Sequence, residues 1–189
     1  MVGESIRTLL SGGSRRSIGN ANQVAALVSR NPEQFRHLIE CLWDPSDPVV
    51  RMRAADAAEK ATRENRPLLQ PYKQELLGLL AETTQKEMRW HLAAMIPRLQ
   101  LNAPERRRAV ATLQTWLTDP GSIVKTFVMQ GLADLAPRDP AVREQIEILT
   151  RTGTPAMRAR GRKLLAKLEA CEVITAGKTP DTRPRNSRR

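Results

Sequence analysis

The chain has 189 residues, with 31 lysines and arginines against 20 aspartates and glutamates, a net charge of +11, and only two cysteines. Two distant cysteines without histidine or cysteine neighbours at ligand spacing argue against a disulfide framework and a zinc site, and they fit a reducing compartment. Because no apolar run reaches the length of a secretory signal or the ~20 residues that span a bilayer, we expect a cytoplasmic protein without membrane contact.

The positive charge leans toward the two ends of the chain. Residues 1–30 carry a net +3, residues 31–170 a net +5, and residues 171–189 a net +3. An excess of this kind is compatible with acidic partners such as nucleic acid or an anionic protein surface. The central part is only moderately basic.

Residues 1–19 are predicted to be an irregular N-terminal cap. "SIRTLL" is typical of a short helix, and the following "SGGSRRSIGN" is a connection rich in glycine and serine that we expect to be mobile. From residue 20 onward, "ANQVAALVSR" begins a predicted helical domain that continues to residue 170.

Within that domain the sequence repeats. An apolar residue followed at once by a basic residue recurs four times, at separations of 38, 36 and 33 residues. Periods of this size indicate repeated supersecondary units. The four pairs are Val50-Arg51, Met88-Arg89, Val124-Lys125 and Met157-Arg158.

The residues at offsets 4, 8 and 11 from each apolar residue are apolar or small, and these offsets share one face of a helix. They are Ala54, Ala58, Ala61, Leu92, Ile96, Leu99, Val128, Leu132, Leu135, Gly161, Leu165 and Leu168.

A leucine-containing helix is predicted before each of these helices, across the short breaks "DPSDP", "TTQ", "DPGS" and "TGTP". Each unit is therefore a helix, a tight turn and a second helix, which gives an all-α protein. Such a pair cannot bury its apolar face alone, so the pairs must stack on one another. The alanines Ala54, Ala58 and Ala61 are expected where neighbouring layers touch.

Helix pairs at this period, with an Asp-Pro turn and a "VR" step into the second helix, resemble the HEAT-repeat family of armadillo-like α-solenoids. "DPVVRMRAADA" and "DPGSIVK" carry the resemblance most closely. It implies a right-handed α-solenoid of about four stacked helix pairs, whose second helices line a concave binding surface. It further implies a ladder in which Arg51, Arg89, Lys125 and Arg158 pair with the turn acids Asp47 and Asp119.

The residues between the core positions of the second helices are therefore the candidate partner-binding surface. Trp90 and His91 lie beside Arg89, and we favour packing over a base-binding pocket for this aromatic cluster. The candidate surface consists of Arg53, Asp56, Lys60, Glu87, Trp90, His91, Thr126, Arg160 and Lys163.

A basic cluster occupies the last repeat, because no acid lies between Glu147 and Glu169. It is either a solvated face that protects the final repeat or a contact for an anionic partner such as nucleic acid. Besides Arg160 and Lys163, its members are Arg151, Arg158, Arg162 and Lys167.

The last segment, residues 171–189, is predicted to be a basic, disordered tail. Neither a metal cluster nor a catalytic triad is indicated, because the two histidines, His37 and His91, lie 54 residues apart. The leading hypothesis is a non-enzymatic scaffold that binds another protein, without cofactor, metal or small-molecule substrate. The alternative is a nucleic-acid-binding solenoid that uses the basic repeat and tail. One version of this alternative is an activity like that of a DNA glycosylase.

Overall fold

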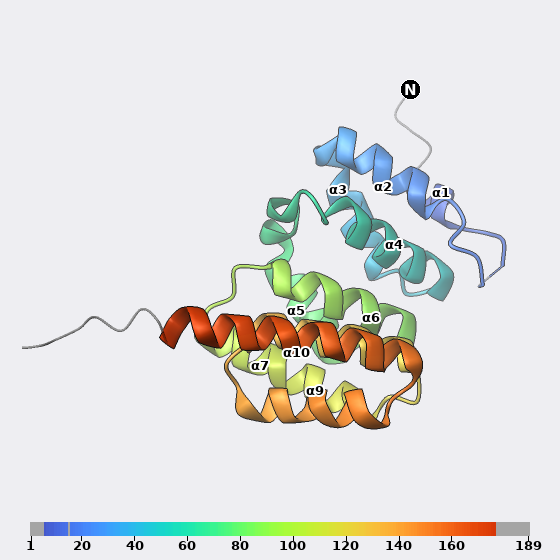
Figure 1. Ribbon diagram of the computed structural model, residues 1–189. Coiled ribbons are helices and arrows are strands. Elements are labelled where there is room, and N and C mark those ends of the chain that lie inside the picture. The colour runs from blue at the N-terminus through green and yellow to red at the C-terminus, as the bar shows by residue number, and fades with distance from the viewer. Residues whose placement is uncertain (1–5, 15, 177–189) are drawn as a thin grey trace, which may run out of the picture.

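The computed structural model describes residues 6–14 and 16–176, and over these residues the chain is all-α (Figure 1). Ten α-helices and four short 3₁₀ helices are joined by turns, and the described residues contain no strand. The prediction of an all-α protein is confirmed. No helix in this part of the chain is long and apolar enough to cross a membrane.

The helices follow one another closely along the chain. The α-helices are α1 (Ile6–Leu10), α2 (Ala21–Arg30), α3 (Phe35–Leu42), α4 (Pro48–Ala61), α5 (Lys73–Glu82), α6 (Lys86–Met95), α7 (Ala103–Thr115), α8 (Ser122–Leu135), α9 (Pro140–Thr152) and α10 (Pro155–Ala176). The 3₁₀ helices are Pro32–Gln34, Arg66–Tyr72, Ile96–Arg98 and Trp116–Thr118.

The last helix is longer than the sequence predicts, since α10 continues to Ala176 rather than ending at the expected domain boundary at residue 170. The rest of the predicted tail, residues 177–189, lies outside the described residues.

Proline and a polar cap set the beginnings of several helices. Before α4, the Asp47 carboxylate accepts a hydrogen bond of 2.8 Å from the backbone N–H of Val49, and Pro48 takes the first helical position. Asp139 does the same for α9, and Asn102 with Glu105 forms a capping box at α7. Proline is tolerated there because the first N–H groups of a helix have no partner within the helix.

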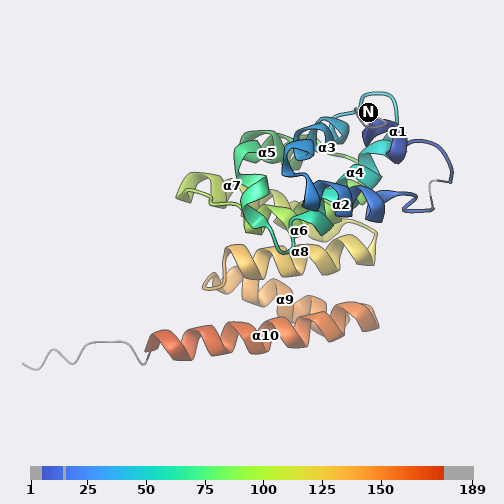
Figure 2. The same ribbon diagram turned by 90° about the horizontal axis from the view of Figure 1, so that it is seen from above.

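Consecutive helices pack in pairs, and the pairs contact one another in chain order. The paired helices are α1 with α2, α3 with α4, α5 with α6, α7 with α8, and α9 with α10. The second members also touch in series, α2 to α4, α4 to α6, α6 to α8, and α8 to α10. In Figure 2, α8, α9 and α10 follow one another away from the N-terminal helices.

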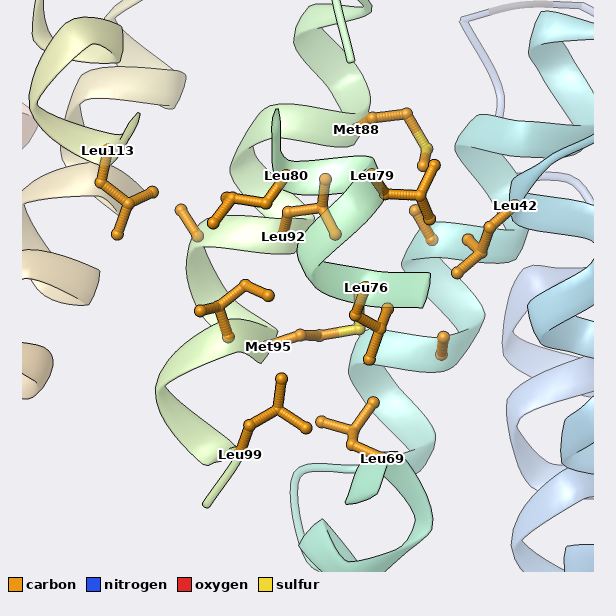
Figure 3. Packing of buried hydrophobic residues seen from close by; sticks show 14 of the residues in the cluster. Leu42, Leu69, Leu76, Leu79, Leu80, Met88, Leu92, Met95, Leu99 and Leu113 are labelled. Atoms are coloured by element: carbon orange, nitrogen blue, oxygen red, sulfur yellow. The ribbon is translucent and has the colours of Figure 1, made fainter. Parts of the chain in front are cut away.

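The predicted apolar stripe is buried in each of the four helices that carry it, α4, α6, α8 and α10. Its leading residues Val50, Met88, Val124 and Met157 are at most 3 % exposed. Figure 3 shows how Met88, Leu92 and other residues of α6 interdigitate with leucines of α5 and the preceding pair. The one departure is Leu165, which is half-buried, while its neighbour Leu164 is buried in its place.

Small residues let the second helices approach closely. Ala54, Ala58 and Ala61 are buried in α4, which packs against α2, α3 and α6. In α8, a Cβ added to Gly131 would lie 2.7 Å from the backbone oxygen of Ala93 in α6. A larger residue at position 131 would therefore force these two helices apart.

Candidate binding groove

A groove of about 690 Å³ runs across the second helices of successive pairs. It is bounded by the C-terminal end of α4 and the start of the following 3₁₀ helix, by α6 with its 3₁₀ extension, by α8 and by α10. Its lining consists of Glu59, Arg63, Arg66, Ala93, Ala94, Pro97, Arg98, Phe127, Gln130, Asp134, Arg160 and Lys167.

Helical spacing places these side chains on one face of each helix, about 100° around from the buried stripe. In α8, Phe127, Gln130 and Asp134 follow one another at intervals of three and four residues, and in α10, Arg160 and Lys167 are seven residues apart. Residues at these intervals share one face of an α-helix. The same packing that buries the stripe therefore fixes the groove.

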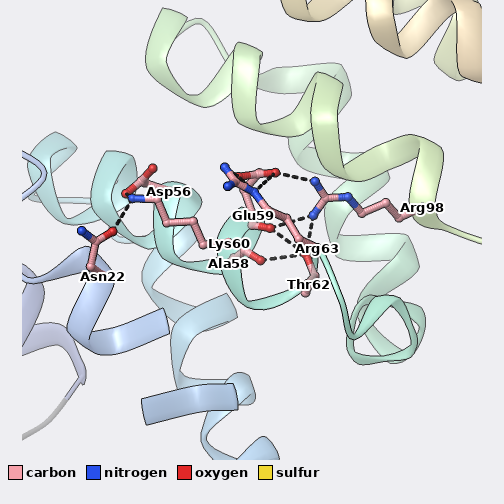
Figure 4. Close-up of polar contacts among 8 residues, drawn as sticks. All are labelled: Asn22, Asp56, Ala58, Glu59, Lys60, Thr62, Arg63 and Arg98. Atoms are coloured by element: carbon pink, nitrogen blue, oxygen red, sulfur yellow. Dashed lines mark hydrogen bonds and ion pairs between the residues drawn. The ribbon is translucent and has the colours of Figure 1, made fainter. Parts of the chain in front are cut away.

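One wall of the groove is organised by the buried carboxylate of Glu59, which is 5 % exposed (Figure 4). The Arg63 guanidinium donates to it at 2.6 Å, and Arg98 reaches it from the end of α6. Arg98 also donates to the Thr62 hydroxyl at 2.9 Å. Burial alone would raise the pKa of Glu59, but the hydrogen bonds and charges of both arginines outweigh it, so its pKa is lowered.

The opposite wall joins α8 to α10. The Lys167 ammonium donates to Asp134 at 2.7 Å, and the Gln130 amide donates to the same carboxylate at 2.9 Å. The amide oxygen of Gln130 accepts a 2.9 Å hydrogen bond from the Arg160 guanidinium. Arg160 is thus held in place by a neutral group.

The groove carries more positive than negative charge. Five of its lining side chains are cationic and two are anionic, a surplus of three. Glu59 serves two arginines, and Asp134 serves Lys167. Arg160 has a neutral partner, and exposed Arg66 has no side-chain partner among the described residues.

Part of the groove lining is apolar, and the side chains of Phe127, Ala94 and Pro97 are called its floor from here on. Phe127 is half-buried, with one side packed against the hydrophobic core, and it lies on the lining beside Ala94 and Pro97. A lining that combines apolar and charged side chains suits an amphipathic ligand better than a purely ionic one.

The sequence identified part of this groove. Arg160 and Lys167 line it, and Lys163, which lies between them on α10, is exposed. Sequence reasoning missed Phe127, Arg98, Glu59 and Arg63. The sequence did contain a signal for Phe127. It lies three residues after Val124, the first residue of its stripe, and the predicted site residues Arg53, His91 and Arg160 hold the same position in their own repeats.

The prediction that Arg53 is available to a partner is wrong. Arg53 is 2 % exposed, and its guanidinium donates to backbone carbonyls of the segment that joins α1 to α2. The acceptors are the oxygens of Leu10 at 2.8 Å, Ser11 at 3.3 Å, Gly12 at 2.6 Å, Ser14 at 3.0 Å and Ser17 at 3.1 Å.

The described residues of the glycine-rich connection, which the sequence predicted to be mobile, are thereby wrapped around one side chain and hydrogen-bonded to it. Gly12, Gly13 and Gly19 adopt positive φ, which glycine does without strain. A Cβ on Gly19 would lie 2.7 Å from Cζ of Arg53. These glycines permit the close wrapping, and the repeat period gave no sign of it.

His91 is also unavailable to a partner, since it is 8 % exposed. Burial lowers its pKa to about 4, so the imidazole is neutral at pH 7. Its ring lies 5.3 Å from that of half-buried Trp90. The structure thus favours packing for this cluster, and the prediction that His91 contacts a partner is wrong.

The remaining residues of the candidate surface that lie in α4, α6 and α8 are half-buried. The Lys60 ammonium donates to Asp56 and to the Asn22 amide oxygen, each at 2.6 Å, which ties α4 to α2 (Figure 4). Thr126 donates to a carbonyl of its own helix. Glu87 lies in the first turn of α6.

The basic cluster of the last repeat is divided between Arg151 at the end of α9 and two faces of α10. Helical spacing puts Lys163 on the side of Arg160 and Lys167, whereas Arg158 and Arg162 lie on another side. Arg151, Arg158, Arg162 and Lys163 are exposed, and in the described part of the chain none of them has a side-chain partner.

The expected ladder of turn residues is formed only in part. Arg89 donates to Asp119 at 2.9 Å, and Arg51 donates at 3.1 Å to Gln85, which stands in the next turn. Asp47 does not act as a ladder acid, because its carboxylate caps α4. Neither Lys125 nor Arg158 pairs with an acid among the described residues.

Comparison of this chain with protein-family models, with curated proteins and with solved structures finds no match. Within the described residues, no three side chains of histidine, cysteine, aspartate or glutamate are grouped so as to hold a metal ion.

Proposed function

We propose that the chain is a short, right-handed α-solenoid of the HEAT type and acts as a non-enzymatic scaffold that binds another protein. The order of contacts supports this proposal, since each second helix packs against the next one along the chain. The burial of the repeat stripe in the four second helices that carry it, α4, α6, α8 and α10, supports it as well.

The observation that carries the proposed function is the groove, whose lining comes from α4, α6, α8 and α10 together. Its polar side chains are already held by hydrogen bonds across helices, as between Arg98 and Thr62 and between Arg160 and Gln130. A surface ordered in advance loses little entropy on association, which favours binding.

The proposed function is tested by affinity capture of partners from extract of the source cells, with and without nuclease treatment, and with Arg160→Gln as the groove variant. The matched control is Arg158→Gln, which removes the same charge from another face of the same helix. Proteins that the control retains and the groove variant loses would support the proposal. Capture that is unaffected by Arg160→Gln, or that requires intact nucleic acid, would refute it.

A second candidate function, nucleic-acid binding, is favoured by the exposed and unpaired cations of the last repeat, Arg151, Arg158, Arg162 and Lys163. Such binding would weaken steeply with salt as counterions are released from the phosphates. Replacing these four residues with alanine should then abolish binding of a labelled oligonucleotide. Unchanged affinity would eliminate this candidate.

The proposed setting is the cytoplasm, where thiols remain reduced. Cys41 is a free, buried thiol. Burial raises the pKa of Cys41 to about 11, so this thiol is not suited to act as a nucleophile.

A further inference from the structure

We infer that the groove receives an extended, acidic segment of a partner protein that carries an apolar side chain between its carboxylates. This inference rests on the proposed function and specifies the chemistry of the partner. It follows from three features of the groove: its surplus of positive charge, the N–H groups that its arginines Arg66 and Arg160 have available for a ligand, and its apolar floor.

The surplus charge is positioned where a ligand can use it. Arg160 donates one hydrogen bond to the neutral Gln130 amide and keeps its other N–H groups available. Arg66 also lines the groove, and it is exposed and without a side-chain partner in the described structure. A guanidinium presents two parallel N–H groups that match the two oxygens of a carboxylate.

The apolar floor belongs to the same groove as these cations and adds a second requirement. Phe127 is only partly covered by the core, and it lines the groove together with Ala94 and Pro97. An apolar or aromatic side chain of the ligand would cover this surface, and such anchors supply much of the affinity of peptide complexes. A segment with acidic residues alone would leave this apolar surface exposed to water.

The walls of the groove favour a protein segment over nucleic acid. The carboxylates of Glu59 and Asp134 are part of the lining, so a backbone with a negative charge at every nucleotide would run beside them. The exposed cations Arg158 and Arg162 lie on another face of α10 and do not extend the groove. A peptide can place its few charges so as to avoid the two acids.

The chain's own C-terminal segment is a poor occupant on grounds of charge. Residues 177–189 contain one lysine and four arginines against one aspartate. Their positive charge repels a groove that already holds three surplus positive charges. The complementary ligand is therefore a separate, acidic segment.

The inference is tested by selecting binders from a library of random peptides displayed on phage, with the immobilised full chain as the target. We expect the recovered peptides to combine several acidic residues with an apolar or aromatic residue. In fluorescence anisotropy with synthetic copies, Arg160→Gln should weaken binding by about tenfold or more, whereas Arg158→Gln should change it by about twofold or less.

A synthetic peptide with its acidic residues replaced by the corresponding amides serves as the ligand control and should lose affinity to a similar extent. Thermal melting of each variant verifies that it is folded. Recovered peptides that bind in the groove without acidic residues would overturn the inference and leave the proposed function standing. Recovery of no peptide, or of acidic peptides insensitive to Arg160→Gln, would also overturn the inference, while the capture experiment decides the proposed function independently.

Discussion

Replacing Arg53 with alanine should destabilise the chain through the N-terminal connection. In the native protein the buried guanidinium binds five backbone oxygens, two of them at 2.6 and 2.8 Å. A hydrogen bond to a charged group contributes roughly 1.5–3 kcal/mol. The five contributions do not add, because Gly12, Ser14 and Ser17 are exposed and water can solvate their carbonyls once the side chain is gone. We expect a loss of about 2–4 kcal/mol.

The effect is measured by urea denaturation of Arg53→Ala, with Arg66→Ala as control, since Arg66 is exposed and unpaired in the described part of the chain. Hydrogen exchange should also show faster exchange in residues 11–20 of the variant. A change in stability of less than about 0.5 kcal/mol, with exchange unaltered, would refute the structural role of Arg53.

A double-mutant cycle isolates the contact itself. Gly19→Ala places a Cβ 2.7 Å from Cζ of Arg53 and also strains a residue whose φ is +51°. With Arg53 absent only the backbone strain remains, which costs about 1–2 kcal/mol. Gly19→Ala should therefore be less destabilising in the Arg53→Ala background. Equal costs in both backgrounds would show that the connection does not touch this side chain.

Three further predictions concern the packing of the second helices. Because the pKa of His91 is lowered to about 4 by burial, the unfolded chain binds a proton between pH 6.5 and 4 that the folded chain does not, so stability should fall by up to about 3 kcal/mol on acidification through this window. His91→Gln should remove this part of the pH dependence in denaturation curves, and an unchanged dependence would contradict the assignment. Gly131→Ala should lower the melting temperature, since overpacking against Ala93 at about 1–3 kcal/mol exceeds the gain in helix propensity of about 1 kcal/mol; a higher melting temperature would show that α6 and α8 can separate freely. Arg89→Gln leaves the buried Asp119 without its cation and should destabilise by about 3 kcal/mol in urea, whereas a neutral result would mean that Asp119 is satisfied by water.

The repeated helices could be predicted because one physical requirement, burial of an apolar stripe at helical spacing, acts on every repeat. Val50, Met88, Val124 and Met157 are buried as this requirement demands. The prediction departs at Leu165, which is half-buried. It lies in α10, the last of the second helices, where no further layer follows within the described residues.

The groove was harder to predict. The spacing of residues along a helix shows which of them share a face, but it does not show which other segment packs on that face. Arg53 and Arg160 both lie three residues after the first residue of their stripes. The connection between α1 and α2 covers Arg53, whereas Arg160 lines the groove. Phe127 and the predicted Thr126 differ by one position, which is about 100° around the helix. The pairing of Glu59 with Arg98 joins residues 39 positions apart, a separation that carries no local signal.

The central claim is that partners bind in the groove across α4, α6, α8 and α10, and the two phenylalanines of the chain allow a direct test. Phe127 lies on the groove floor, whereas Phe35 is 1 % exposed in the core. After labelling with 4-fluorophenylalanine, the protein should show two fluorine resonances, and titration with a selected acidic peptide should shift the Phe127 resonance and leave that of Phe35 in place. A bound peptide that leaves the Phe127 resonance unmoved would contradict the account.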